Sequence, residues 1–136
     1  MSELREPTER QPEHSPVVLI VDDEPFIRAT AEDCLGEAGF DVITATNADN
    51  ALSVLDARSD VRVVFTDVQM PGTMDGLGLA QKIHERWPRI GVVVTSGRKR
   101  PTEASLCDDP FLEKPYSPST LVREIRESVL RHGKRI

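Results

Sequence analysis

The chain has 136 residues, the length of one average domain, and 38% of them are hydrophobic and 29% charged, as in ordinary globular proteins. Its formal net charge of −6 argues against a nucleic-acid-binding surface, which needs a basic face. The sequence has no apolar stretch of the roughly 18 residues that a membrane span needs and no apolar signal core, so we expect a cytoplasmic protein without membrane contact.

The chain begins with a polar segment and continues as alternating apolar runs and helical patterns. Residues 1–15 carry mixed charge and two prolines, and we expect them to form a disordered arm. The remaining chain is expected to form one domain over residues 16–132, followed by a short tail over residues 133–136. Apolar, mostly β-branched runs predict five strands, at residues 17–21, 41–45, 61–66, 90–94 and 111–113.

Helix-start and helix-stop residues lie between these predicted strands. Pro25 suits the first turn of a helix that Gly39 ends. Asn47 suits the cap of the next helix, because its side chain can accept a backbone hydrogen bond. A third helix is predicted to end before Pro88, which disfavours helical backbone in the residue that precedes it.

The alternation of strands and helices predicts the fold class. Five βα units indicate an α/β fold with a doubly wound, five-stranded parallel sheet and helices on both of its faces. Right-handed crossovers favour the strand order 2-1-3-4-5, in which the first and third strands lie side by side. The segment 97–109 is polar and only weakly periodic, so we expect the fourth helix to be short or irregular.

Four of the five predicted strands end in polar residues that suit phosphate chemistry. Asp22 and Asp23 follow the first strand, Asp67 the third, Thr95 the fourth and Lys114 the fifth. Because ligands bind at the carboxyl ends of parallel strands, we expect these side chains to converge on one edge of the sheet. Three carboxylates there repel one another, and Mg²⁺, which prefers hard oxygen ligands, would relieve that repulsion.

The same residues divide into metal ligands and a nucleophile. We expect Asp23 and Asp67 to bind Mg²⁺ directly, and the backbone carbonyl of Gln69 is a plausible further ligand. Asp22 would act through a water molecule or by orienting the other two acids. Asp67 is also the best candidate for a nucleophile toward phosphorus, which would give an acyl phosphate.

Two further side chains are expected to assist phosphoryl transfer to Asp67. Lys114 can neutralise phosphoryl oxygens, and Thr95 can donate a hydrogen bond to one of them. We therefore expect Asp67, which ends a central strand, to face both Lys114 and Thr95.

The remaining reactive side chains indicate no second site. His14, His84 and His132 have no predicted acid or cysteine partner, and we interpret them as having no catalytic or ligand role. Cys34 and Cys107 lack metal-ligand spacing, which is typical of free thiols in a reducing compartment. The sequence contains neither of the familiar glycine-rich phosphate loops.

The chain resembles the receiver domains of two-component response regulators over residues 17–131. Five stretches carry the resemblance: VLIVDDE (18–24), FTDVQMP (65–71), MDGL (74–77), VTSG (94–97) and FLEKPY (111–116). It implies the flavodoxin-like receiver fold. The chain departs from the family by one extra residue at 72–73 and by a shorter connection between Thr95 and Phe111, which again points to a short or irregular fourth helix.

The resemblance also implies roles for individual residues. Asp67 would accept a phosphoryl group from a phosphohistidine on a sensor histidine kinase or a histidine phosphotransfer protein. Asp22 and Asp23 would be the acidic pair that holds Mg²⁺. Thr95 would be the switch hydroxyl and Phe111 the switch aromatic residue.

These observations favour a phosphoacceptor switch over an enzyme. Few residues follow Arg131, so we expect a single-domain regulator that signals by binding an unidentified downstream protein or by onward phosphotransfer. The alternative is a Mg²⁺-dependent phosphatase or phosphotransferase with an aspartyl nucleophile, which needs a second acid where this chain has Gln69. An interaction module that is never phosphorylated would be favoured if an acid or Lys114 were missing, and none is.

Overall fold

The computed structural model describes residues 15–97, 101–102, 106 and 108–133. Five parallel strands form one sheet: β2 (Val17–Val21), β3 (Asp41–Ala45), β4 (Val61–Asp67), β5 (Gly91–Ser96) and β6 (Phe111–Glu113). They lie in the order β3-β2-β4-β5-β6, which is 2-1-3-4-5 when the strands are counted along the chain. The predicted fold class and strand order are therefore confirmed.

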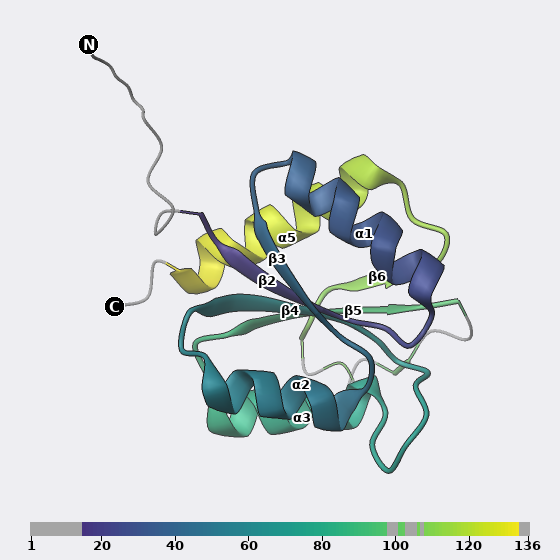
Figure 1. Cartoon of the computed structure of the whole chain (residues 1–136), viewed down its shortest axis with the longest axis vertical. Helices are drawn as coiled ribbons and strands as arrows, with labels where there is room; N and C mark the ends of the chain where they lie inside the picture. The colour runs from purple at the N-terminus through teal and green to yellow at the C-terminus, as the bar shows by residue number, and fades with distance from the viewer. Residues whose placement is uncertain (1–14, 98–100, 103–105, 107, 134–136) are drawn as a thin grey trace.

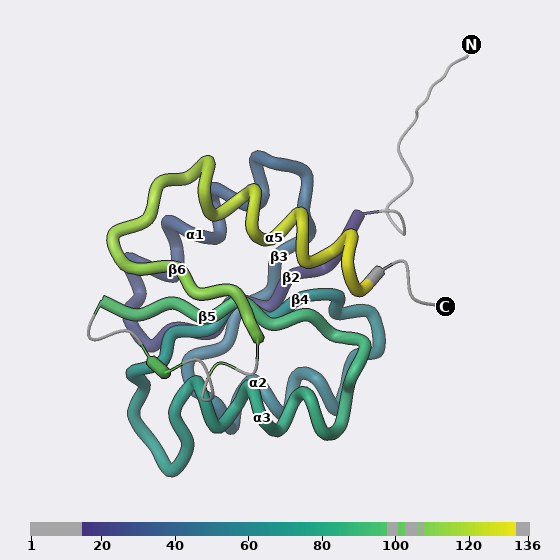
Figure 2. Tube along the Cα trace, turned by 180° about the vertical axis from the view of Figure 1, so that it is seen from behind, coloured from purple at the N-terminus to yellow at the C-terminus, as the bar shows by residue number. Residues whose placement is uncertain are grey.

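Helices cover both faces of the sheet (Figure 1). Helices α1 (Pro25–Glu37) and α5 (Pro118–Gly133) pack on one face. Helices α2 (Ala48–Ala57) and α3 (Gly76–Arg86) pack on the other, and the reverse view in Figure 2 shows the same three layers. No helix in the described ranges is long and apolar enough to cross a membrane.

The core forms two apolar clusters, one on each side of the sheet. Every residue of β2 is buried, because this strand has neighbours on both edges and helices on both faces. Its side chains alternate between the two clusters, with Leu19 directed toward α2 and α3 and Ile20 toward α1 and α5. This rigid central strand ends directly before Asp22, so the core fixes where the first acid lies.

The predicted helix ends are confirmed by their capping contacts. Pro25 occupies the start of α1, and the Glu24 side chain accepts a hydrogen bond from the Phe26 N–H. Asn47 caps α2 by accepting from the Asn50 N–H at 2.8 Å. Gly39 follows α1 with a φ of 101°, a left-handed conformation that glycine adopts without steric cost.

Strands β4 and β5 extend further toward the carboxyl-terminal edge than their apolar residues predict. Asp67 is the last residue of β4 and is paired in register with Thr95 of β5. The Val68 N–H also donates to the Thr95 carbonyl at 2.9 Å. These two site residues therefore belong to the hydrogen-bonded sheet, which orients them more firmly than a loop would.

Three predicted segments fall wholly or partly outside the described residues. The arm predicted over residues 1–15 is described only at residue 15, and the tail over 133–136 only at residue 133. Within the segment 97–109, the Leu106 N–H donates to the Thr102 carbonyl at 3.1 Å, and Leu106 is buried in the core. Whether a complete fourth helix forms there stays a prediction.

The expectation that no histidine has an acidic partner is wrong for His84. Its Nε2 lies 2.9 Å from an oxygen of Asp109, which is 25 residues away in the sequence. The hydrogen bond to Asp109 raises the pKa of His84 above its ordinary value. The pair joins α3 to the chain just before β6, a contact that only the tertiary fold creates.

Candidate functional site

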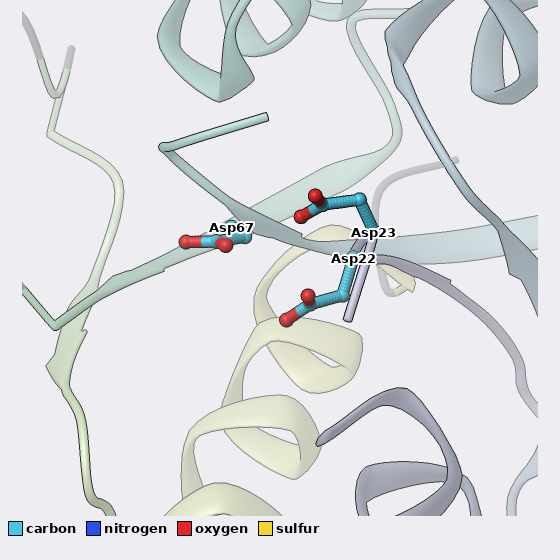
Figure 3. A group of neighbouring side chains, drawn as sticks. All are labelled: Asp22, Asp23 and Asp67. Carbon is cyan, nitrogen blue, oxygen red and sulfur yellow. The ribbon is translucent and has the colours of Figure 1, made fainter. Parts of the chain in front are cut away.

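The three predicted acids lie together at the carboxyl-terminal edge of the sheet. Asp22 and Asp23 directly follow β2, and Asp67 ends the neighbouring strand β4. Each contributes a carboxylate oxygen to a group whose members lie within 4.8 Å of one another. Figure 3 shows the side chains of Asp22 and Asp23 reaching from one strand end toward that of Asp67. The predicted convergence of the acids is therefore present in the structure.

Asp22 is held in place by backbone and side-chain contacts. Its Oδ1 accepts a hydrogen bond from the Glu24 N–H at 2.9 Å, and its backbone carbonyl accepts one from Arg28 at 2.8 Å. Its Oδ2 lies 3.3 Å from the ammonium nitrogen of Lys114. Asp22 is buried whereas Asp23 is exposed, so Asp23 has the greater freedom to meet an ion arriving from solvent.

Asp67 is buried with only one of its two carboxylate oxygens in a polar contact. Its Oδ2 lies 3.3 Å from the ammonium of Lys114, while its Oδ1 has no hydrogen-bond partner among the described residues. Burial raises the pKa of Asp67; Lys114 opposes this increase, and the nearby Asp22 adds to it. A buried carboxylate oxygen without a partner is costly, and a cation or a covalent partner would offset that cost.

Lys114 contacts two of the acids rather than Asp67 alone. Its ammonium lies 3.3 Å from oxygens of both Asp22 and Asp67. Lys114 follows β6, and its backbone N–H donates to the Ser96 carbonyl at 2.9 Å, which holds the start of the loop against β5. The Lys114 side chain, which comes from the end of β6, therefore links Asp22 after β2 to Asp67 at the end of β4.

The hydroxyl of Thr95 is hydrogen-bonded to the neighbouring strand, and its predicted bond to a phosphoryl oxygen stays a prediction. Thr95 is buried beside Asp67 in the sheet, but its Oγ1 donates to the Leu112 carbonyl at 2.7 Å. In this conformation the Thr95 hydroxyl is therefore hydrogen-bonded to the backbone of β6. Phe111, the predicted switch aromatic residue, lies next to Leu112 and packs half-buried against the cluster under α2 and α3.

Sequence reasoning missed two side chains at this edge. The Ser96 hydroxyl donates to the Gln69 side-chain oxygen at 2.7 Å and joins the end of β5 to the loop after β4. Burial raises the pKa of Tyr116 to about 12, with the charges of Asp22 and Asp67 adding to the effect. The Tyr116 ring packs edge-on against Phe65, at 5.6 Å between centroids. No local pattern marks either contact, because each joins segments that meet only in the folded chain.

The acid cluster fits a hard divalent cation. Three carboxylates carry a charge of −3 and Lys114 supplies +1, so the site is short of positive charge. The partnerless Oδ1 of Asp67 and the exposed carboxylate of Asp23 leave oxygen ligands available. Mg²⁺ commonly uses one or two protein carboxylates and completes its octahedron with water or phosphate oxygens. The donor set is therefore compatible with Mg²⁺.

Residues 18–126 match the family model described as the response regulator receiver domain. The chain belongs to this family. Members are phosphoacceptor switches of two-component signalling and not classical enzymes, as the resemblance implied. AruR, a transcriptional regulatory protein of Pseudomonas aeruginosa, is 33% identical over 85% of this chain and 50% of its own length. LuxN, an autoinducer sensor kinase/phosphatase of Vibrio campbellii, is 36% identical over 79% of this chain and 13% of its own length.

Solved structures agree with the fold. A receiver domain protein of Clostridium thermocellum has a TM-score of 0.82, covering 89% of this chain and 99% of its own, at 22% identity. The response regulator TrrA of Thermotoga maritima, solved with Mg²⁺ and BeF, has a TM-score of 0.76 at 26% identity, covering 83% and 98%. The chain spans about half of AruR and a smaller part of LuxN. A single-domain organisation and the absence of nucleic-acid partners thus stay predictions, as does the cytoplasmic location.

Proposed function

We propose that Asp67 accepts a phosphoryl group from a phosphohistidine of a sensor histidine kinase or a histidine phosphotransfer protein, with Mg²⁺ bound at the acid cluster. One observation carries the proposal: the buried Asp67 carboxylate has Lys114 at one oxygen and no partner at the other. That arrangement leaves a nucleophile beside a cation that can neutralise the incoming group. Mg²⁺ would be held by Asp23 and Asp67, with the Gln69 carbonyl as a further ligand and Asp22 acting through a water molecule or by orienting the other two acids. The bound ion would supply positive charge to the phosphoryl oxygens.

The transfer step needs little from the protein beyond position and charge. The carboxylate of Asp67 forms a bond to phosphorus as the bond from phosphorus to the donor imidazole nitrogen breaks, and the imidazole keeps that electron pair. Lys114 stays at the site as the counter-charge for the phosphoryl oxygens.

The response to phosphorylation runs through Thr95. A phosphoryl oxygen at Asp67 offers the Thr95 hydroxyl a stronger acceptor than the Leu112 carbonyl that it now uses. When the hydroxyl moves, it leaves space beside β6 that Phe111 can enter. The half-buried Phe111 ring then changes the surface that a downstream protein or a further phosphotransfer partner binds.

An exposed apolar residue beside the pocket that contains Lys114 supports a docking position for the donor protein. Phe26 is 78% exposed at the start of α1. Together with Ile27, Pro115 and Tyr116, it lines a largely apolar pocket that also includes Lys114. A donor that covers this pocket reaches Asp67 over a short path, so we place donor docking there.

Intact-mass measurement with acetyl phosphate tests the acceptor. The wild-type chain should gain one phosphoryl group only when Mg²⁺ is present, and Asp67→Asn should gain none. Asp33→Asn, an exposed acid on α1, is the matched control and should behave as wild type. Uptake that persists in Asp67→Asn or in excess chelator contradicts the assignment.

A second comparison tests donor docking separately. Phe26→Ala should slow transfer from a phosphorylated histidine protein while leaving uptake from acetyl phosphate unchanged. Leu130→Ala removes another exposed apolar side chain, on α5, and should change neither rate. If Phe26→Ala leaves protein-to-protein transfer at the wild-type rate, the donor binds elsewhere.

A further inference from the structure

The opposite edge of the sheet, where the strands begin, contains a second pocket. It has a volume of about 760 Å³ and lies between the ends of α2 and α3 and the starts of β4 and β5. Its apolar lining includes Leu55, Val61, Trp87 and Ile90. We call it the basal pocket. It is remote from the acid cluster, which lies at the other end of the same strands.

Four arginines line the basal pocket, and two of them are explained by local structure. Arg58 caps the end of α2 and is bound by Asp60 through two contacts, at 2.9 and 2.7 Å. Arg86 ends α3, contacts Asp56 at 2.6 Å and lies over the Trp87 ring at 4.4 Å. Cations are favourable at helix C-termini, so these two arginines need no ligand.

Arg62 is not explained in this way. Val17 of β2 pairs with Val61, whereas Val18 pairs with Val63, so Arg62 is the additional residue of a β-bulge. Bulges re-aim side chains and occur next to functional sites. Here Arg62, a half-buried residue, lines the basal pocket, while Val61 and Val63 on either side of it are buried in the core.

Arg62 and Arg89 leave positive charge in the pocket without an acid. Within the described ranges neither arginine forms an ion pair. The four lining arginines and the single lining acid, Asp56, give +3. Asp60 beside Arg58 reduces this to +2, and Asp41, whose charge also acts on Arg58, reduces it to +1. The pocket is therefore positively charged, although the chain as a whole has a formal net charge of −6. Arg62 is half-buried and Arg89 is exposed, and two arginines without an ion pair beside an apolar lining favour an anionic ligand.

We propose that the basal pocket binds an acidic segment of a partner protein, one rich in aspartate and glutamate. The four arginines come from four different segments around the pocket: the end of α2, the bulge in β4, the end of α3 and the turn before β5. This spread suits several carboxylates along a peptide better than one compact anion. The apolar lining suits the side-chain stems of such a peptide. Because the pocket lies at the opposite end of the strands from Asp67, this contact anchors the partner independently of the proposed phosphoacceptor site.

Trp87 provides a direct readout, since it is the sole tryptophan of the chain and lines the pocket. An N-acetylated octaglutamate amide should change its fluorescence in a saturable way, and more weakly as salt is raised. Octaglutamine should have no effect. Arg62→Gln and Arg89→Gln should each weaken octaglutamate binding about fivefold. Arg123→Gln is the matched control, because the Arg123 side chain is exposed on α5 and lies outside the pocket. This variant should bind octaglutamate as wild type does.

Four results would overturn the proposal. The first is the absence of a saturable response, and the second is an equal loss of affinity in Arg123→Gln. The third is displacement of octaglutamate by a lower concentration of inorganic pyrophosphate, which would indicate a small-anion site. The fourth is a gain in affinity when residues 1–14 are removed, since this segment has four glutamates and would then be the occupant. Beryllofluoride, which mimics the phosphoryl group at Asp67, should leave octaglutamate affinity unchanged.

Discussion

Replacing Gly76 with alanine should damage the phosphoacceptor site through the backbone alone. Gly76 is the first residue of α3, and its N–H donates to the Val68 carbonyl at 2.9 Å. A Cβ at this position would lie 2.0 Å from the Asp67 carbonyl oxygen and 2.9 Å from the Val68 Cα. Both neighbours are backbone atoms of the strand end that carries the acceptor, so neither can rotate away.

The size of the effect follows from that contact. Relieving it requires the start of α3 and the end of β4 to separate by roughly 1 Å, and overpacking of this kind costs about 1–3 kcal/mol. Alanine's better helix propensity recovers at most about 1 kcal/mol. We therefore expect Gly76→Ala to lower the free energy of unfolding by about 2 kcal/mol and to slow phosphoryl uptake by Asp67, because the shifted backbone moves its carboxylate relative to Lys114.

Urea unfolding, with uptake of phosphate from acetyl phosphate measured in parallel, tests this reasoning. Gly36→Ala is the matched control, because a Cβ there meets nothing within 4 Å. That variant should be as stable as wild type or more so, with the gain that alanine gives in a helix. If Gly76→Ala unfolds at the wild-type urea concentration with an unchanged slope and takes up phosphate normally, the close approach does not position Asp67.

Three further predictions concern single side chains. Asp23→Ala should weaken Mg²⁺ binding about tenfold or more in calorimetry, with an unchanged free energy of unfolding. Asp22→Ala removes a buried, hydrogen-bonded acid and should lower both the Mg²⁺ affinity and the free energy of unfolding. The raised pKa of His84 contributes stability that is complete below its ordinary value of 6.5 and is lost as pH rises through the raised value. NMR titration should locate that pKa, and His84→Gln should remove the slope of unfolding free energy against pH. Ser128→Ala should raise the free energy of unfolding measured in urea by up to about 1 kcal/mol, because this buried hydroxyl has no partner in the described part of the chain; a lower free energy of unfolding would reveal one.

Much of the fold could be predicted because its signals are local. The run Val17–Val21 is apolar over its whole length, as a central parallel strand must be. Asn47 and Pro25 mark helix starts within a few residues of themselves. The sequence predicts the ends of β4 and β5 just before Asp67 and Thr95, because these two residues are polar. Pairing between neighbouring strands, which no local pattern reveals, carries both residues into the sheet.

The candidate site also has contacts that the sequence predicts and contacts that it does not. The sequence predicts which acids meet, since topology alone brings the ends of β2 and β4 together. It does not predict that the Thr95 hydroxyl turns to Leu112, because that choice depends on rotamer and local competition for acceptors. The sequence also does not predict the bulge at Arg62, because a register shift depends on how two strands pair and not on one strand alone.

The electrostatics of the acid cluster explain why a switch can be built here. Three carboxylates and Lys114 sum to −2, and burial makes that excess costly, as the raised pKa of Asp67 shows. A divalent cation would bring the sum to zero, and a phosphoryl group then adds negative charge in a place where Lys114 and the Thr95 hydroxyl are within reach. The fold itself holds the acids together against their repulsion. Under the proposed function, metal and phosphate would act on an arrangement whose charge already favours a change, and a shift of the Thr95 hydroxyl would report it.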